Sequence, residues 1–206
     1  STDASGASIS ETFDLTVSNA NEGPSDIGLS NTTVAENAAG AVVGTLSTTD
    51  VDAGDTHSYS VSDNRFEVVG GQLKLKDGIS LDHEGEPSVS VTVTSTDASG
   101  ASISEDFTIN VANANEGPSD IGLSNSTVAE NAAGAVVGTL STTDVDAGDS
   151  HSYSVSDNRF EVVGGQLKLK DGVSLDHEGE PSVSVTVTST DASGASISET
   201  FDLTVS

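Results

Sequence analysis

Apolar and polar residues alternate along most of this chain. Val89, Val91 and Val93 are separated by Ser or Thr, and the same alternation continues through residues 103–111. A period of two is typical of strands that bury one face in an antiparallel sheet. We therefore predict paired strands, and we find no convincing helical period.

Residues that favour turns separate the alternating runs at short intervals. The predicted turns are Asn37-Ala38-Ala39-Gly40, Asp50–Asp55, Gly70-Gly71 and Asp97-Ala98-Ser99-Gly100. The strands predicted between them cover residues 27–34, 41–48, 57–61, 66–69, 72–75, 89–94 and 103–111. The Gly-Gly pair predicts a two-residue hairpin turn. About seven short strands in so short a stretch are typical of a β-sandwich.

The sequence repeats itself almost perfectly. Residues 19–112 and 113–206 align without a gap, and residues 1–18 are identical to 189–206. The two long copies differ only at Thr32/Ser126, Thr56/Ser150, Ile79/Val173, Asp106/Thr200, Thr108/Asp202, Ile109/Leu203, Asn110/Thr204 and Ala112/Ser206. Each copy is long enough for a domain with its own core. We therefore predict an all-β chain of two tandem Greek-key β-sandwiches, preceded by a leftover terminal strand.

The repeat boundaries predict domains at 23–114 and 115–206. Residues 1–22 are then the last strand and linker of a preceding repeat. Three copies of the last strand exist for two sandwiches, so we expect 1–18 to be surplus. Because it carries Ile9, Phe13, Leu15 and Val17, it is either mobile or pairs through residues 7–18 with the sheet edge of another molecule. Otherwise we expect a monomer.

Charge narrows the possible functions. The chain has 33 acidic and six basic residues, a formal charge of −27, and no Cys. Nucleic-acid binding needs a basic surface, and so does attraction to an anionic membrane. The acidic excess therefore argues against both kinds of partner. Strong self-repulsion destabilises a compact chain unless something neutralises it. Bound divalent cations are the obvious candidate, and no apolar run is long enough for direct membrane insertion.

The acidic residues gather in or beside the predicted turns, which places them at the ends of each sandwich. Each motif alone is compatible with a solvated acidic turn. The segment Asp50–Asp55 also resembles the start of an EF-hand loop, but Asp55 stands where that loop needs Gly. Val61 stands where it needs Glu. No single motif therefore identifies a metal site.

Together the motifs resemble the cadherin repeat, particularly the bacterial cadherin-like repeats of large surface adhesins. The motifs that carry the resemblance are Val-Ala-Glu-Asn (Glu36, Glu130), Asp-Val-Asp (Asp50 and Asp52, Asp144 and Asp146), Leu-Asp-His-Glu (Asp82 and Glu84, Asp176 and Glu178), Thr-Asp-Ala-Ser-Gly (Asp97, Asp191) and the linker Asn-Ala-Asn-Glu-Gly-Pro (19–24, 113–118). The family linker is usually written Asp-x-Asn-Asp-x-Pro, so Asn113 and Glu116 are departures. The resemblance implies a cadherin- or immunoglobulin-like sandwich.

The resemblance also implies calcium bound between consecutive repeats, with ligands from both. Carried over to this chain, the complete junction uses Glu36, Asp82 and Glu84, the linker residues Asn115 and Glu116 with the carbonyls of Ala114 and Gly117, and then Asp144, Asp146 and Asp191. Hard oxygen ligands suit Ca2+ over zinc or copper. Up to three ions would balance these carboxylates, and the departures in the linker leave the number of ions open.

Two partial sites accompany this junction. One lies at the N-terminal side and comprises Asn21, Glu22, Asp50, Asp52 and Asp97. The other lies at the C-terminal side and comprises Glu130, Asp176 and Glu178. Each holds half of the ligand set, so we expect it to bind calcium weakly or not at all. His83 and His177 lie between proposed ligands. Because side chains alternate in direction along this turn, we expect both histidines to point outward and not to bind the metal.

The resemblance implies a calcium-rigidified spacer in a secreted cell-surface adhesin, whose partners are the neighbouring repeats of the same chain. The alternative is a ligand-binding or self-associating adhesion module, for carbohydrate or for another repeat. Carbohydrate sites usually offer exposed aromatic rings, and Tyr59 and Tyr153 are the only candidates. No nucleophile and base stand in a catalytic arrangement, so we do not expect an enzyme.

Overall fold

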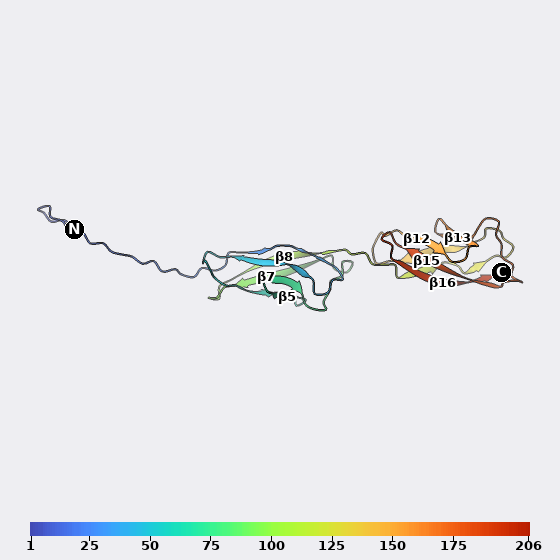
Figure 1. The fold of residues 1–206 in the computed structure, drawn as a ribbon, viewed down its shortest axis with the longest axis horizontal. Coiled ribbons are helices and arrows are strands. Elements are labelled where there is room, and N and C mark those ends of the chain that lie inside the picture. Colours follow the sequence, from blue (N-terminus) through green and yellow to red (C-terminus); the bar gives the residue numbers. More distant parts are fainter. The chain divides into compact units, whose positions relative to one another are not determined.

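The computed structural model describes residues 1–206, and every regular element in it is a β-strand. The chain divides into two compact units, the first containing β1–β8 and the second β9–β16 (Figure 1). Each unit is built from two four-stranded sheets. No helix with the length and apolar character to cross a membrane is found. The predicted all-β chain of two tandem sandwiches is confirmed.

The two units share one strand order. The first contains β1 Asp26–Leu29, β2 Thr33–Ala35, β3 Val42–Thr49, β4 Ser58–Val61, β5 Phe66–Val69, β6 Gln72–Leu75, β7 Ser88–Thr96 and β8 Ser102–Ala112. The second contains β9 Asp120–Leu123, β10 Thr127–Val128, β11 Val136–Thr143, β12 Ser152–Val155, β13 Phe160–Val163, β14 Gln166–Leu169, β15 Ser182–Thr190 and β16 Ser196–Val205. In the first unit one sheet has the order β1-β3-β6-β5 and the other β2-β8-β7-β4.

The strand predicted at residues 27–34 is wrong, because the chain there forms two strands in opposite sheets. β1 pairs antiparallel with β3, whereas β2 joins the sheet of β8. The amide of Asn31 donates to the carbonyls of Thr33 and Val43, both at 2.7 Å, and these bonds hold the crossing. A Cβ at Gly44 would lie 2.9 Å from the Asn31 backbone, so Gly is needed there. Each unit therefore has eight strands rather than about seven.

Alternating side chains of the long strands build the core. On β7, Val89, Val91 and Val93 are buried, while the Ser and Thr between them face outward. β8 lies beside β7, pairs Phe107 with Val91 and buries Ile109 (Figure 1). Each unit has its own cluster of buried apolar residues. Because the period of two matches the pleat, one face of each sheet is covered and the other is polar.

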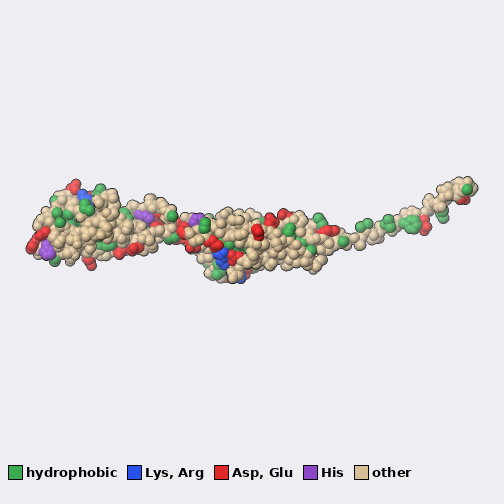
Figure 2. Space-filling view, turned by 180° about the vertical axis from the view of Figure 1, so that it is seen from behind, with side chains coloured by type: hydrophobic (Ala, Val, Ile, Leu, Met, Phe, Trp, Pro, Cys, Tyr) green, Lys and Arg blue, Asp and Glu red, His purple; other side chains and the backbone are tan.

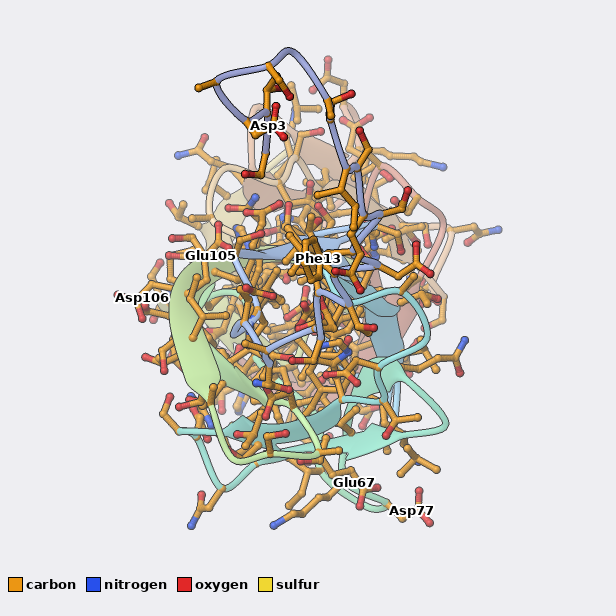
Figure 3. All side chains as sticks on the ribbon, turned by 90° about the vertical axis from the view of Figure 1, so that its left-hand side faces the viewer. Asp3, Phe13, Glu67, Asp77, Glu105 and Asp106 are labelled. Carbon is orange, nitrogen blue, oxygen red and sulfur yellow. The ribbon has the colours of Figure 1, made fainter.

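The Gly70-Gly71 pair forms the predicted turn between β5 and β6. Both glycines have positive φ, +58° and +78°, which the primed hairpin turns require. Lys74 of this hairpin lies 3.5 Å from the carboxylate of Glu67 and 2.9 Å from that of Asp77. Both acids lie at the lower edge of Figure 3. The hairpin thus carries ion-paired bases on a solvated face, where such pairs contribute little stability.

Residues 1–18 form no strand in this structure, and β8 occupies the last position of the first sandwich. Asp3 closes a small turn by accepting the backbone N–H groups of Ser5 and Ala7, at 2.9 and 3.0 Å. Asp3 and Phe13, both labelled in Figure 3, belong to this segment. Its apolar side chains are all exposed: Ile9, Phe13, Leu15 and Val17. Pairing of this segment with another molecule stays a prediction.

The packing of β6 and β14 gives a direct test of the core. Leu73 and Leu167 are fully buried, whereas Val69 and Val163 on the same hairpins are more than half exposed. We expect Leu73→Ala combined with Leu167→Ala to lower the free energy of unfolding by about 2–5 kcal/mol per repeat, because each change leaves a cavity. Urea denaturation measures this loss. Val69→Ala with Val163→Ala should change stability by less than about 0.5 kcal/mol; equal losses would contradict the assigned core.

Candidate metal centre

Acidic side chains meet at one end of the second unit, which we call its upper end. Asp144 follows β11 and Asp191 follows β15. Within the loop after β11, the backbone N–H of Asp146 donates to Asp144 Oδ1 at 3.1 Å. The Asp191 carboxylate accepts the N–H groups of Gly194 and Ala195 at 2.6 and 2.8 Å. Local hydrogen bonds therefore orient both carboxylates before any ligand is considered.

Several hydrogen bonds bind the linker to this upper end, among them one from Ser193 Oγ to Asn115 Oδ1 at 2.8 Å. Asn113 Nδ2 donates to Asp146 Oδ1 at 2.9 Å, and the backbone N–H of Glu116 donates to Asp146 Oδ2 at 2.7 Å. Asn115 Nδ2 donates to Asp191 Oδ2 at 2.9 Å. Both oxygens of Asp146 are therefore used to hold the linker on the repeat that follows it.

The earlier copy of the linker is held in the same way on the first unit. Asn19 Nδ2 donates to Asp52 Oδ1, and the N–H of Glu22 donates to Asp52 Oδ2 at 2.7 Å. Asn21 Nδ2 donates to Asp97 Oδ2 at 3.0 Å. No sandwich precedes this copy in the structure, so the attachment depends only on the linker and the repeat after it.

Three carboxylates at each upper end converge. One oxygen each of Asp144, Asp149 and Asp191 lies within 4.8 Å of the others, and Asp50, Asp55 and Asp97 form the same group in the first unit. The predicted ligands Asp146 and Asp52 are not members of these groups, whereas Asp149 and Asp55, which the sequence motifs did not select, are. The signal was present in Asp-Val-Asp-Ala-Gly-Asp, but only the folded loop shows that its last Asp turns toward Asp191.

A histidine that the sequence analysis missed contacts each group. His151 Nε2 lies 2.8 Å from Asp144 Oδ2, and His57 Nε2 lies 3.0 Å from Asp50 Oδ2. Each histidine begins the segment into β12 or β4, seven residues after its aspartate. The loop must close before the two side chains meet, which explains why no sequence motif revealed the contact.

The lower end of the second unit gathers Glu130, Asp176 and Glu178, whose carboxylate oxygens lie within 4.8 Å of one another. The backbone N–H of His177 donates to Glu130 Oε2 at 3.2 Å. The exposed His177 also bonds through Nδ1 to the Val205 carbonyl, at 2.6 Å. It therefore fixes the loop to β16 and is more than an outward-pointing bystander.

The corresponding residues of the first repeat lie in equivalent loops. Glu36 is only 2% exposed in the turn after β2, while Asp82 and Glu84 are exposed between β6 and β7. The N–H of Asn37, whose φ is +56°, donates to the Leu81 carbonyl at 3.0 Å. The second repeat has the same bond, from Asn131 to Leu175.

The linker glycine packs closely against the last turn of the repeat that follows it. A Cβ at Gly117 would lie 3.1 Å from the Cβ of Ala195, and one at Gly23 would lie 3.0 Å from that of Ala101. Contacts this short would require the linker or the turn that carries Asp191 to shift by a few tenths of an ångström. The carbonyls of Gly117 and Ala114 stay predicted ligands.

Hydrogen bonding favours the charged form of these acids. Asn115, followed by backbone N–H groups, lowers the pKa of Asp191, and Asn21 does the same for the pKa of Asp97. The pKa of Asp50 is lowered first by the N–H of Asp52 and then by His57. Figure 2 shows acidic side chains recurring along each unit, with Lys and Arg confined to small areas. Ionised carboxylates are the ligands that Ca2+ prefers, so the acids at the upper ends suit that ion.

The two tyrosines considered for a carbohydrate site pack against the cores of their own units. Tyr59 packs against the core, and its hydroxyl lies 2.8 Å from Thr48 Oγ1. Tyr153 makes the equivalent contact with Thr142, also at 2.8 Å. Both tyrosines are half-buried.

Solved structures of cadherins share the architecture. Human protocadherin-24 EC1-2 superposes with a TM-score of 0.73 and 19% identity, over 91% of this chain and 99% of that one. Each unit has the fold of a cadherin repeat. Four extracellular cadherin domains of protocadherin gamma B7 give a TM-score of 0.65 at 25% identity, over 90% of this chain and 50% of theirs. Drosophila N-cadherin EC1-4 superposes with a TM-score of 0.68 and 22% identity, over 85% of this chain and 47% of that one.

This chain thus spans about half the length of the four-domain structures. No family model and no curated protein sequence matches it. The likeness to these structures shows that the units share the cadherin fold.

The hydrogen bond from Asn115 predicts a pH effect in metal-free protein. The pKa of Asp191 lies below its ordinary 3.8, so the resulting stabilisation is present above that pH and is lost as the pH falls through the folded-state pKa. We expect Asn115→Ala to raise the pKa of Asp191 toward 3.8, measured by NMR titration of the carboxyl carbon with chelator present. Asp97, which Asn21 holds, is the internal control; an unchanged Asp191 would contradict the assignment.

Proposed function

We propose that these repeats are calcium-rigidified spacers of a cell-surface adhesin. The observation that carries the proposal is the presence of oriented acidic groups at both ends of one repeat. β15 runs from the loop of Asp176 and Glu178 to the turn of Asp191. With nine residues at ~3.3 Å each, it separates the two groups by roughly 30 Å. A repeat of this kind can share ions with a neighbour on either side.

The junction between the two repeats would use ligands from three segments. Glu36, Asp82 and Glu84 come from the lower end of the first repeat, and Asn115 and Glu116 come from the linker. Asp144, Asp146 and Asp191 come from the upper end of the second repeat, with the carbonyls of Ala114 and Gly117. Seven of these are carboxylates, whose mutual repulsion Ca2+ would remove. Calcium thereby converts a repelling hinge into a fixed joint.

The near identity of the repeats supports a structural role, because a stalk needs length rather than a distinct surface on each domain. Residues 23–114 and 115–206 are the repeating units of this proposal, and 1–22 supplies the last strand and linker of a repeat before them. Extracellular modules commonly bind calcium at ~10⁻⁴ to 10⁻³ M. A joint with this affinity would bind calcium and become rigid outside a bacterial cell. Its partners are the neighbouring repeats.

Self-association is a second candidate, favoured by the exposed apolar side chains of Ile9, Phe13, Leu15 and Val17. One structurally similar protein, protocadherin gamma B7 EC3-6, has a cis-dimer structure. Size-exclusion chromatography with light scattering separates the candidates. A concentration-dependent dimer that disappears without residues 1–18 would favour association, and a monomer favours the spacer.

Calcium should change both the stability and the shape of the chain. We expect a higher melting temperature with calcium than with chelator, because bound ions stabilise only the folded state. Small-angle scattering should show a larger maximum dimension with calcium. A chain that responds in neither measurement would refute the calcium joint.

The duplicated glutamate provides a matched pair of variants for the junction. Glu36→Gln removes a carboxylate from the complete junction, whereas Glu130→Gln alters the same motif where no linker follows it in this chain. We expect Glu36→Gln to weaken the calcium-dependent lengthening about tenfold in calcium concentration, which corresponds to ~1.4 kcal/mol. Glu130→Gln should leave the scattering titration unchanged. Equal effects would contradict a joint centred on the linker.

A further inference from the structure

We propose that Arg65 and Arg159, the only arginine of each repeat, are positioning residues that hold the acidic loop at the lower end of their own repeat. We call this loop the lower loop; it comprises residues 82–86 in the first repeat and 176–180 in the second. Each lower loop carries two of the predicted calcium ligands. The inference deepens the proposed function and rests on it, but the arginines themselves bind no metal.

Arg159 is anchored on the side of the sandwich where β13 begins. Its backbone N–H donates to Asp157 Oδ1 at 2.9 Å, and its carbonyl accepts the N–H of Lys170 at 2.9 Å. The next residue, Phe160, is the first of β13 and is 1% exposed. The guanidinium donates to Asp157 Oδ2 through Nε at 3.1 Å and through Nη2 at 2.7 Å. Both the backbone and the side chain of Arg159 are therefore held by their own repeat.

Other donors of the same guanidinium reach the lower loop. Nη1 donates to Glu180 Oε2 at 2.6 Å, and Nη2 lies 3.4 Å from Glu180 Oε1. An arginine that contacts both oxygens of a carboxylate fixes the orientation of that carboxylate as well as its distance. The pKa of Arg159 is raised by its hydrogen bonds to Asp157 first and to Glu180 second. The guanidinium thus joins two segments of the chain.

The backbone of Glu180 connects this contact to the predicted ligands. Its N–H donates to the Asp176 carbonyl at 2.8 Å, which closes the turn formed by residues 176–180. Glu178 lies inside this turn, and its carboxylate converges with those of Asp176 and Glu130 to within 4.8 Å. Because Glu180 closes the turn, a contact that holds Glu180 also limits the positions that both ligands can take.

The first repeat has the same frame. Arg65 donates to Asp63 Oδ1 through its backbone N–H at 2.9 Å and to Asp63 Oδ2 through Nη2 at 2.7 Å. The N–H of Glu86 donates to the Asp82 carbonyl at 2.9 Å, which closes the equivalent turn. Because the two repeats align without a gap, Glu86 stands at the position of Glu180. Glu86 is therefore the partner of Arg65 in this proposal.

Charge alone predicts a different result from positioning. A cation beside a group of acids repels Ca2+, so Coulomb's law by itself predicts tighter calcium binding when Arg65 is removed. It predicts weaker binding when the negative charge of Glu86 is removed. Positioning predicts weaker binding in both cases, because the contact is lost whichever partner is replaced. The sign of the effect for Arg65 therefore separates the two explanations.

The experiment is a calcium titration of the full chain, followed by small-angle scattering. We expect Arg65→Gln and Glu86→Gln each to raise the calcium concentration at half-maximal lengthening about three- to tenfold, less than the ~10- to 100-fold cost of removing a group that contacts a metal ligand directly. Arg65→Lys should recover only part of the loss, because lysine keeps the charge but cannot form the forked contact. Tighter or unchanged calcium binding by Arg65→Gln would overturn the proposal.

Arg159→Gln is the matched control. It loses equivalent contacts beside the lower end of the second repeat, where no linker follows in this chain, so it should leave the scattering titration unchanged. A difference between the two arginine variants then reflects the junction and not a loss of stability. An equal shift in both would overturn the proposal.

Amide hydrogen exchange in chelator tests the hold on the lower loop without any metal. We expect faster exchange at Glu180 in Arg159→Gln and at Glu86 in Arg65→Gln, because each turn opens more readily without its arginine. Unchanged exchange at both would overturn the proposal.

The scattering titration also separates this inference from the proposed function. A chain that never lengthens with calcium overturns the spacer and the inference together. A chain that lengthens at the same calcium concentration in every variant overturns the inference alone and keeps the spacer.

Discussion

The crowding of ionised carboxylates at the ends of each repeat is the constraint on which the rest of this protein depends. The sandwich brings acids from separate loops together, and local N–H groups and asparagine amides keep them charged, as the lowered pKa of Asp191 indicates. Such an arrangement stores repulsion that hydrogen bonds only partly offset. A divalent cation is the simplest partner that satisfies several of these oxygens at once. The apolar cores stabilise each sandwich, and the repelling carboxylates at its ends would be stabilised by cations.

The linker is hydrogen-bonded directly to the acidic end of the repeat that follows it. Asn113, Asn115 and the backbone of Glu116 bind the repeat that follows. Asparagine at 113 donates a hydrogen bond to Asp146, which an aspartate at that position would instead repel. In the proposed joint, the linker would already be held on the following repeat before a metal binds, so calcium would have less chain to order.

Much of the fold was predictable because the relevant interactions are local. The alternation of Val89, Val91 and Val93 and the paired glycines at 70 and 71 describe strands and turns directly. Residues 27–34 were predicted wrongly because their apolar positions fit one strand. The break depends on Asn31, whose amide bonds to Val43 of another strand. That contact exists only after the sheets have assembled.

The sequence by itself determined the repeat, the period of the strands and the placing of acids in turns, because each follows from neighbouring residues. Only the tertiary structure decided which acids meet. Asp144 and Asp191 are 47 positions apart, and they converge because strand order brings β11 and β15 to the same end. Asp146 and Asp149 are chemically identical in the sequence. Hydrogen bonds to the linker turn one toward Asn113, and the folded loop turns the other toward Asp144 and Asp191.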